Sequence, residues 1–154
     1  MKMESETNSV YMEISSSGRS RDLSILRKMV CCIAHEVGFD EEEIAKIEMS
    51  VDEACANVVC HAYKQFPSLA GEKRCLIKLV IEANEEQMHI TISDYGVGDS
   101  EGPHNGVEDL QEYARRGHGL GTYIIRKFMD QVEFCYPGDS GTKVSMVKYI
   151  SRNE

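Results

Sequence analysis

Three polar side chains stand four residues apart near the middle of the chain: Glu53, Asn57 and His61. Residues four apart in an α-helix lie one above another, so a carboxylate, an amide and an imidazole would follow one side of a helix. The carboxylate and the imidazole can take up or release protons, and all three groups can form hydrogen bonds. The same row would be ordinary on a solvated helix surface, so its interpretation as a site depends on residues further along the chain.

A second polar group ends a strand pattern. In residues 88–94 three apolar side chains alternate with polar ones, and Asp94 has the parity of the apolar row. A carboxylate on a buried face needs a hydrogen-bond donor. Asp94 also opens a D-x-G-x-G motif, in which Gly96 and Gly98 would permit sharp turns and a close approach of a ligand to the backbone. A plain turn after a strand would give the same letters.

A third group of residues precedes a late helix. The letters R-R-G-H-G-L-G-T occupy residues 115–122, and residues 122–132 then show helical spacing. Glycine-rich backbone that leads into a helix N-terminus binds phosphate, because the free N–H groups and the helix dipole point the same way. A dinucleotide fingerprint is a weak alternative, because Thr122 occupies the place of the last glycine and no parallel βαβ unit surrounds the motif.

Periodicity also predicts the elements that would position these groups. Gly38 would end the first helix in a left-handed conformation, and Asp40 would start the second, with acidic residues in its first turn. Thr142 would begin the last strand, either as an ordinary strand residue or with its hydroxyl toward a ligand. Helices are expected at residues 23–37, 40–63 and 122–132, and strands at residues 10–14, 76–83, 88–94, 133–136 and 142–150.

Length and spacing indicate one domain. We expect residues 1–9 to be a flexible N-terminus and residues 10–154 to form a single domain. The polar stretch at about 99–117 is expected to form a lid, because a loop of this length in a compact domain usually has a function.

Composition narrows the class of protein. The chain is 42% hydrophobic and 28% charged, as soluble globular proteins are, and its net charge of -9 argues against a nucleic-acid surface. The acidity suits solubility and a basic protein partner equally well. The chain has no apolar run of about 18 residues that could span a membrane, and its first residues lack the apolar core of a secretion signal, so we expect a cytoplasmic protein.

The arginines near the first helix and the cysteines can each be interpreted in more than one way. Arg19 and Arg21, near the start of the first helix, are either solvated charges or a basic contact for a partner. The six cysteines contain no C-x-x-C pair, so free thiols that act as small apolar side chains are favoured over disulfides or zinc ligands.

The order of the motifs resembles that of a known superfamily. E-x-x-x-N, D-x-G-x-G, G-x-G-L-G and G-T, in this order and with a lid between the second and third, resemble the ATP-binding domain of DNA gyrase, heat-shock chaperones, histidine kinases and MutL. The stretches V-D-E-A-C-A-N-V-V-C-H-A-Y and G-L-G-T-Y-I-I-R-K-F-M-D-Q-V are similar to the anti-sigma-factor serine kinases. The resemblance implies a Bergerat-type α+β fold: a two-layer sandwich with a mixed, mostly antiparallel sheet and helices on one face.

The resemblance also implies roles for single residues. Glu53 would be the catalytic base, Asn57 would hold Mg²⁺, and Asp94 would accept a hydrogen bond from the adenine amino group. His61 matches a family histidine but receives no chemical role. Arg116 is an expected nucleotide contact, and the resemblance leaves open which of Arg115 and Arg116, if either, reaches the γ-phosphate. The remaining expected nucleotide contacts are Gly96, Gly98, Gly117, Gly119, Leu120, Gly121, Thr122 and Thr142.

The implied function is that of an ATP-dependent serine kinase that is also an anti-sigma factor. Such proteins hold a sigma factor inactive and phosphorylate a serine of an anti-sigma-factor antagonist, and family likeness implies a homodimer. A second hypothesis is a non-catalytic, nucleotide-dependent binding module for another partner. A plain ATP hydrolase or a fragment of a sensor kinase is a third, less favoured hypothesis.

Overall fold

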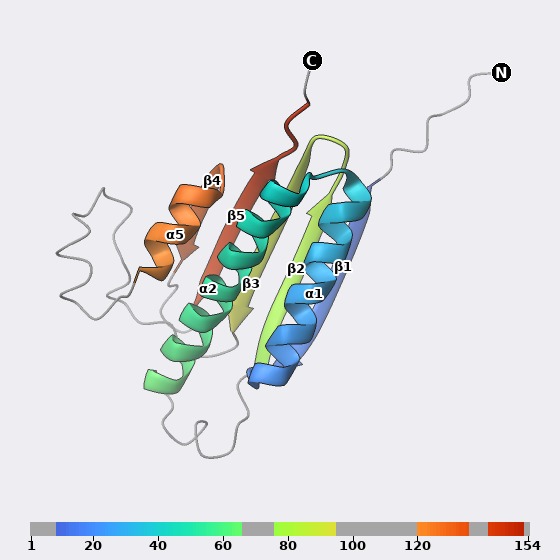
Figure 1. The fold of residues 1–154 in the computed structure, drawn as a ribbon. Helices are drawn as coiled ribbons and strands as arrows, with labels where there is room; N and C mark the ends of the chain where they lie inside the picture. The colour runs from blue at the N-terminus through green and yellow to red at the C-terminus, as the bar shows by residue number, and fades with distance from the viewer. Residues whose placement is uncertain (1–8, 66–75, 95–119, 136–141, 153–154) are drawn as a thin grey trace.

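The protein is an α+β sandwich of one sheet and one layer of helices (Figure 1). The computed structural model describes residues 9–65, 76–94, 120–135 and 142–152. Helices α1, α2 and α5 cover the same face of the sheet (Figure 1). In chain order the elements are β1 (Val10–Ser17), α1 (Ser20–Val37), α2 (Glu41–Gln65), β2 (Leu76–Ala83), β3 (Gln87–Asp94), α5 (Gly121–Phe128), β4 (Gln131–Cys135) and β5 (Lys143–Tyr149).

The sheet has the strand order β1-β2-β3-β5-β4. All four pairings among these described strands are antiparallel. The predicted fold class, a two-layer sandwich with a mostly antiparallel sheet and helices on one face, is therefore confirmed. Asn84 makes the turn between β2 and β3, where its side-chain oxygen accepts hydrogen bonds from the N–H groups of Glu86 and Gln87.

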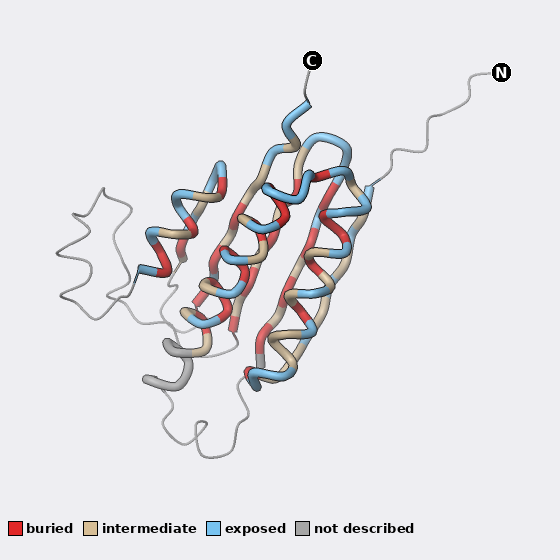
Figure 2. The backbone as a smooth tube through the Cα atoms, viewed as in Figure 1, coloured by how far each residue is buried: buried red, intermediate tan, exposed pale blue. Residues whose placement is uncertain are grey.

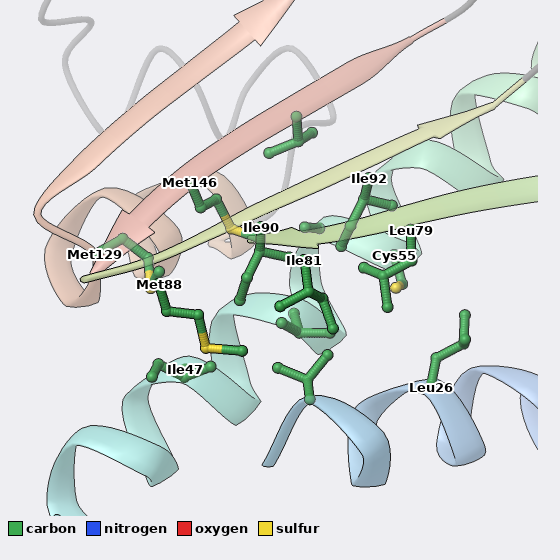
Figure 3. Close-up of a cluster of buried hydrophobic side chains, with 14 of the residues drawn as sticks. Leu26, Ile47, Cys55, Leu79, Ile81, Met88, Ile90, Ile92, Met129 and Met146 are labelled. Atoms are coloured by element: carbon green, nitrogen blue, oxygen red, sulfur yellow. The ribbon is translucent and has the colours of Figure 1, made fainter. Parts of the chain in front are cut away.

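The core lies between the sheet and the helices. The helices turn their buried residues toward the sheet and their exposed residues outward (Figure 2). Alternate residues of β3, from Met88 to Asp94, are buried, as the parity of the sequence predicted. Figure 3 shows apolar side chains of β2, β3 and β5 meeting those of α1 and α2. The helical stripe that the sequence predicted in α2 is buried at Ile44, Ile47, Val51, Ala54 and Val58.

The end of α1 and the start of α2 have the capping residues that the sequence predicted. Gly38 ends α1 with a φ of 105°, a left-handed conformation that favours glycine. Asp40 then caps α2: its Oδ1 accepts from the Glu43 N–H at 2.8 Å, while Glu43 Oε2 accepts from the Asp40 N–H at 3.3 Å. This reciprocal pair is a capping box with aspartate at the cap position. It fixes the residue at which α2 begins.

The ends of β1 and α5 differ from the prediction. Strand β1 continues past Ile14 to Ser17, because the three serines pair with the first residues of β2. Helix α5 ends at Phe128, four residues early, and Val132 belongs to β4, where it pairs with Met146. The helical spacing of Val132 misled the prediction, since an inward-facing strand residue can have the same spacing.

Charged pairs join the helices on their outer side. The Arg27 guanidinium of α1 lies 2.6 Å from the Asp52 carboxylate and 3.3 Å from that of Glu48, both on α2. Asp52 directly precedes Glu53, so the pair holds α1 against the part of α2 that carries the polar row. No helix in the described part of the chain is long and apolar enough to cross a membrane.

The cysteines of the helices should differ sharply in reactivity. Burial raises the pKa of the Cys55 thiol to about 12, so this group stays protonated at pH 8, whereas Cys32 is exposed. We expect a thiol reagent at pH 8 to label Cys32 in the native protein and Cys55 only after unfolding. Peptide mass mapping before and after adding denaturant measures this order. Rapid labelling of Cys55 in the native state would contradict the packing of α2.

Candidate functional site

The polar row of α2 lies at the edge of the packed face. Glu53 and Asn57 are partly exposed, while Ala54, Cys55 and Val58 between and beside them are buried. At about 100° per residue, helical geometry alone would point Glu53 nearly opposite the buried stripe of α2. The structure instead places its carboxylate against the first residue of α5, because α5 packs along this side of α2.

Gly121 makes the close contact with Glu53. A Cβ added to this glycine would lie 3.2 Å from the Glu53 Cδ and nearer still to its Oε2, well inside normal contact distance. The Cβ of Glu53 would be 3.5 Å away, an ordinary contact. The lack of a side chain at Gly121 therefore provides the space that the carboxylate occupies.

An alanine at this position should displace the carboxylate rather than unfold the protein. For the kinase activity that the resemblance implies, we expect Gly121→Ala to lower phosphoryl transfer roughly 10- to 100-fold, because a misplacement of about 1 Å can cost that much in rate. The melting temperature should not fall, since the clash involves the movable end of a side chain and alanine favours a helix by up to about 1 kcal/mol over glycine. Rate assays and thermal melts of the same samples test both statements, and unchanged transfer would contradict the role of this contact.

Asn57 makes the next contact between α2 and α5. Its amide Nδ2 donates to the Thr122 hydroxyl oxygen at 3.5 Å, which is longer than the usual N–H···O distance of about 2.7–3.2 Å. Thr122 is buried, with 6% of its surface exposed. Consecutive residues of α5 thus contact two of the three members of the polar row, Glu53 and Asn57.

Asp94 and Thr142 form a second pair where β3 and β5 lie side by side. The Thr142 N–H donates to Asp94 Oδ1 at 2.9 Å, and the Asp94 N–H donates to the Thr142 carbonyl at 3.1 Å. Both residues are buried. Asp94 lies on the buried face of β3 and therefore needs a hydrogen-bond donor. The backbone N–H of Thr142 is that donor, and it holds the carboxylate in one orientation.

The contacts of Glu53 and Asn57 with α5 and the pair of Asp94 and Thr142 lie at the same end of the sandwich. In Figure 1, the end of β3, the later turns of α2 and the start of α5 occupy one end of the molecule. Leu120 stands at the N-cap position of α5, 60% exposed, and its apolar side chain cannot cap the N–H groups of the first turn. This end of the molecule therefore combines a carboxylate, an amide, a fixed buried carboxylate and a helix start at which the described residue Leu120 provides no side-chain cap.

The donor set fits a nucleotide better than a metal held by protein alone. No group of three or more His, Cys, Asp or Glu side chains that could hold a metal occurs among the residues the structure describes. A Mg²⁺ ion that is bound with phosphates needs only one or two protein ligands, and an amide oxygen is suitable. The start of α5, where Leu120 provides no side-chain cap, suits a phosphate group.

Several expected site residues lie outside the described residues. These are Gly96, Gly98, Arg115, Arg116, Gly117 and Gly119, together with the expected lid at about 99–117 and the side chain of His61. They remain predictions. Within the described part, the sequence assigned Gly121 and Thr122 to the nucleotide and missed their contacts with α2, because a contact between residues 65 positions apart leaves no spacing signal.

Comparisons with known proteins show the family of the chain. Residues 17–148 match the family model described as the histidine kinase-like ATPase domain. The chain is 30% identical to the serine-protein kinase RsbW of Halalkalibacterium halodurans, over 93% of this chain and 85% of that protein. It is also 30% identical to the serine-protein kinase RsbW of Bacillus cereus, over 93% of this chain and 87% of that protein.

A solved structure shows the same fold. The crystal structure of the RsbU and RsbW domains of Rv1364c from Mycobacterium tuberculosis superimposes with a TM-score of 0.62 at 16% identity. The match covers 94% of this chain and 33% of that longer chain. At this identity the likeness concerns the fold alone.

Proposed function

The chain belongs to the histidine kinase-like ATPase domain family, and from this premise we propose that it is an ATP-dependent serine protein kinase that also acts as an anti-sigma factor. Its protein substrate would be an anti-sigma-factor antagonist, phosphorylated on serine, and its second partner a sigma factor in the cytoplasm. We further propose a single domain over residues 10–154, with a lid at about 99–117, that acts as a homodimer.

The observation that carries this proposal is the contact between the polar row of α2 and the start of α5. Glu53 lies against Gly121, at the end of the helix where phosphate binding is favoured. A carboxylate in this place is suited to accept the proton of an attacking serine hydroxyl. The serine oxygen would then form a bond to the γ-phosphorus as the bond from that phosphorus to the ADP oxygen breaks.

The other residues would bind and orient the substrate ATP. Asp94 would accept a hydrogen bond from the adenine amino group, with Thr142 beside it and Gly96 and Gly98 against the base and ribose. Arg116, Gly117, Gly119, Leu120, Gly121 and Thr122 would contact the phosphates. Asn57 would hold Mg²⁺ by its amide oxygen, and the ion when bound neutralises charge on the phosphates. Phosphoryl transfer needs mainly positioning and charge neutralisation, so this set suffices.

A phosphotransfer assay tests the proposal. The purified chain is incubated with Mg²⁺, ATP labelled in the γ-phosphate and each candidate antagonist encoded near its gene. We expect phosphoserine on one antagonist. Nucleotide binding without transfer to any candidate would favour the non-catalytic binding module, and a lack of affinity for adenine nucleotides would overturn both hypotheses.

A capture experiment tests the partner. The chain is immobilised in ATP, in ADP and without nucleotide, and is offered purified sigma factors of the same organism. We expect one sigma factor to be retained and to be released by its unphosphorylated antagonist. Retention of none of them would remove the anti-sigma part of the proposal and leave the kinase part to the phosphotransfer assay.

A further inference from the structure

We infer that Thr122 is a positioning residue that orients the Asn57 amide for metal binding. This inference rests on the proposed function, in which Asn57 holds Mg²⁺. It goes beyond that function because it assigns Thr122 a role toward another side chain of the protein rather than toward the nucleotide alone. The juxtaposition that carries it is the contact between the first turn of α5 and the later turns of α2.

An asparagine amide has two chemically different ends of nearly the same shape. The oxygen accepts hydrogen bonds or binds cations, and the NH₂ group only donates. A rotation of the amide by half a turn exchanges the two at little steric cost, so an asparagine that serves as a metal ligand needs a neighbour that fixes its orientation. A residue that orients a metal ligand by a hydrogen bond, without touching the metal, typically affects metal affinity by a factor of 10 to 100.

Thr122 has the chemistry and the surroundings for that task. Its hydroxyl oxygen accepts from Asn57 Nδ2, so the amide oxygen is the end that remains for an ion. Its surface is 6% exposed, and burial leaves little room for water to replace the hydroxyl. Its place is fixed by the helix, because the neighbouring Gly121 rests on the Glu53 carboxylate of the same row on α2.

The two contacts of α5 thus have different tasks. Gly121 provides space for the carboxylate, whereas Thr122 provides a hydrogen-bond acceptor for the amide. A valine at position 122 keeps the size and branching of threonine and removes only the hydroxyl, and a serine keeps the hydroxyl. This pair of substitutions separates orientation from packing.

The test measures metal binding apart from catalysis. Thr122→Val, Thr122→Ser and wild type are titrated with Mn²⁺ in the presence of ADP, and bound Mn²⁺ is measured by electron paramagnetic resonance. We expect Thr122→Val to weaken Mn²⁺ binding roughly tenfold and Thr122→Ser to stay within about threefold of wild type. Because Thr122 is also an expected phosphate contact, ADP affinity measured without metal can fall in Thr122→Val, but it should fall by a smaller factor than the Mn²⁺ affinity.

Two control variants are needed to interpret the change in Mn²⁺ binding. Thr91→Val makes the same chemical change on β3, on the sheet face opposite the helices, and should leave Mn²⁺ binding unchanged. Asn57→Ala should weaken Mn²⁺ binding at least as much as Thr122→Val. Unchanged Mn²⁺ binding in Thr122→Val beside weakened binding in Asn57→Ala would overturn the inference alone. Unchanged binding in both would overturn the inference together with the proposed role of Asn57.

A third readout excludes a loss of folding. The side-chain NH₂ signals of Asn57 in a nitrogen-15 spectrum should shift in Thr122→Val, while the backbone signals of β2 and β3 should not. A change spread over the whole spectrum, with Mn²⁺ binding weakened equally in Thr122→Ser, would show that position 122 acts through packing and would overturn the positioning role.

Discussion

Glu53→Gln is expected to remove phosphoryl transfer to the antagonist, by a factor of roughly 10² or more. Glutamine has the shape of glutamate and fits the space left by Gly121, but it cannot accept the serine proton. Because Glu53 is assigned to the chemical step, ATP affinity should stay within about threefold of wild type. Single-turnover transfer and equilibrium binding of ATP, measured on the same preparation, test the two parts.

A matched variant on the same helix controls for the loss of a negative charge. Glu42 lies in the first turn of α2, is exposed and pairs with Lys46. We expect Glu42→Gln to transfer phosphate at the wild-type rate, because a surface ion pair contributes little and lies far along the helix from Glu53. If Glu53→Gln also kept the wild-type rate, the carboxylate would not be the base and the non-catalytic module would gain support.

Asp94→Asn is expected to lower ATP affinity roughly 10- to 100-fold. Asparagine can keep the hydrogen bond from the Thr142 N–H, so the end of β3 should stay in place. It loses the charge with which Asp94 would accept from the adenine amino group, and hydrogen bonds to charged groups contribute about 1.5–3 kcal/mol. Titration calorimetry with ATP and with GTP measures the effect, and the preference for ATP over GTP should shrink along with the affinity.

The control for Asp94 is a carboxylate on the same hairpin. Glu82 lies on β2 with its side chain 56% exposed, and Glu82→Gln should leave nucleotide affinity unchanged. Thermal melts of both variants separate lost binding from lost folding, because Asp94 is buried. A fully folded Asp94→Asn protein that binds ATP as tightly as wild type would contradict the placing of adenine at this carboxylate.

Local periodicity explains which parts of the fold could be predicted from sequence. The alternation in β3 predicted that Asp94 would be buried, because side chains on a strand alternate between faces whatever the strand pairs with. Asp40 and Gly38 likewise act within a few residues of themselves. The antiparallel order of strands followed from the resemblance of the motifs to a superfamily rather than from spacing.

The parts that were missed depend on distant partners. Strand β1 is longer than predicted because β2, some sixty residues later, pairs with Ser15–Ser17. The direction of Glu53 depends on α5, and the early end of α5 accompanies the pairing of β4 with β5. No window of neighbouring residues contains these contacts. The roles of Gly96, Gly98 and Arg116 remain predictions from the motifs.

The capping box at the start of α2 also limits how this sequence can evolve. Asp40 and Glu43 fix the residue at which the helix begins, and the polar row starts ten residues after Glu43. Inserting or deleting one residue between them would turn Glu53 and Asn57 by about 100° away from α5. Lineages of this protein can therefore exchange side chains along that span, but its length should tolerate no single-residue gain or loss.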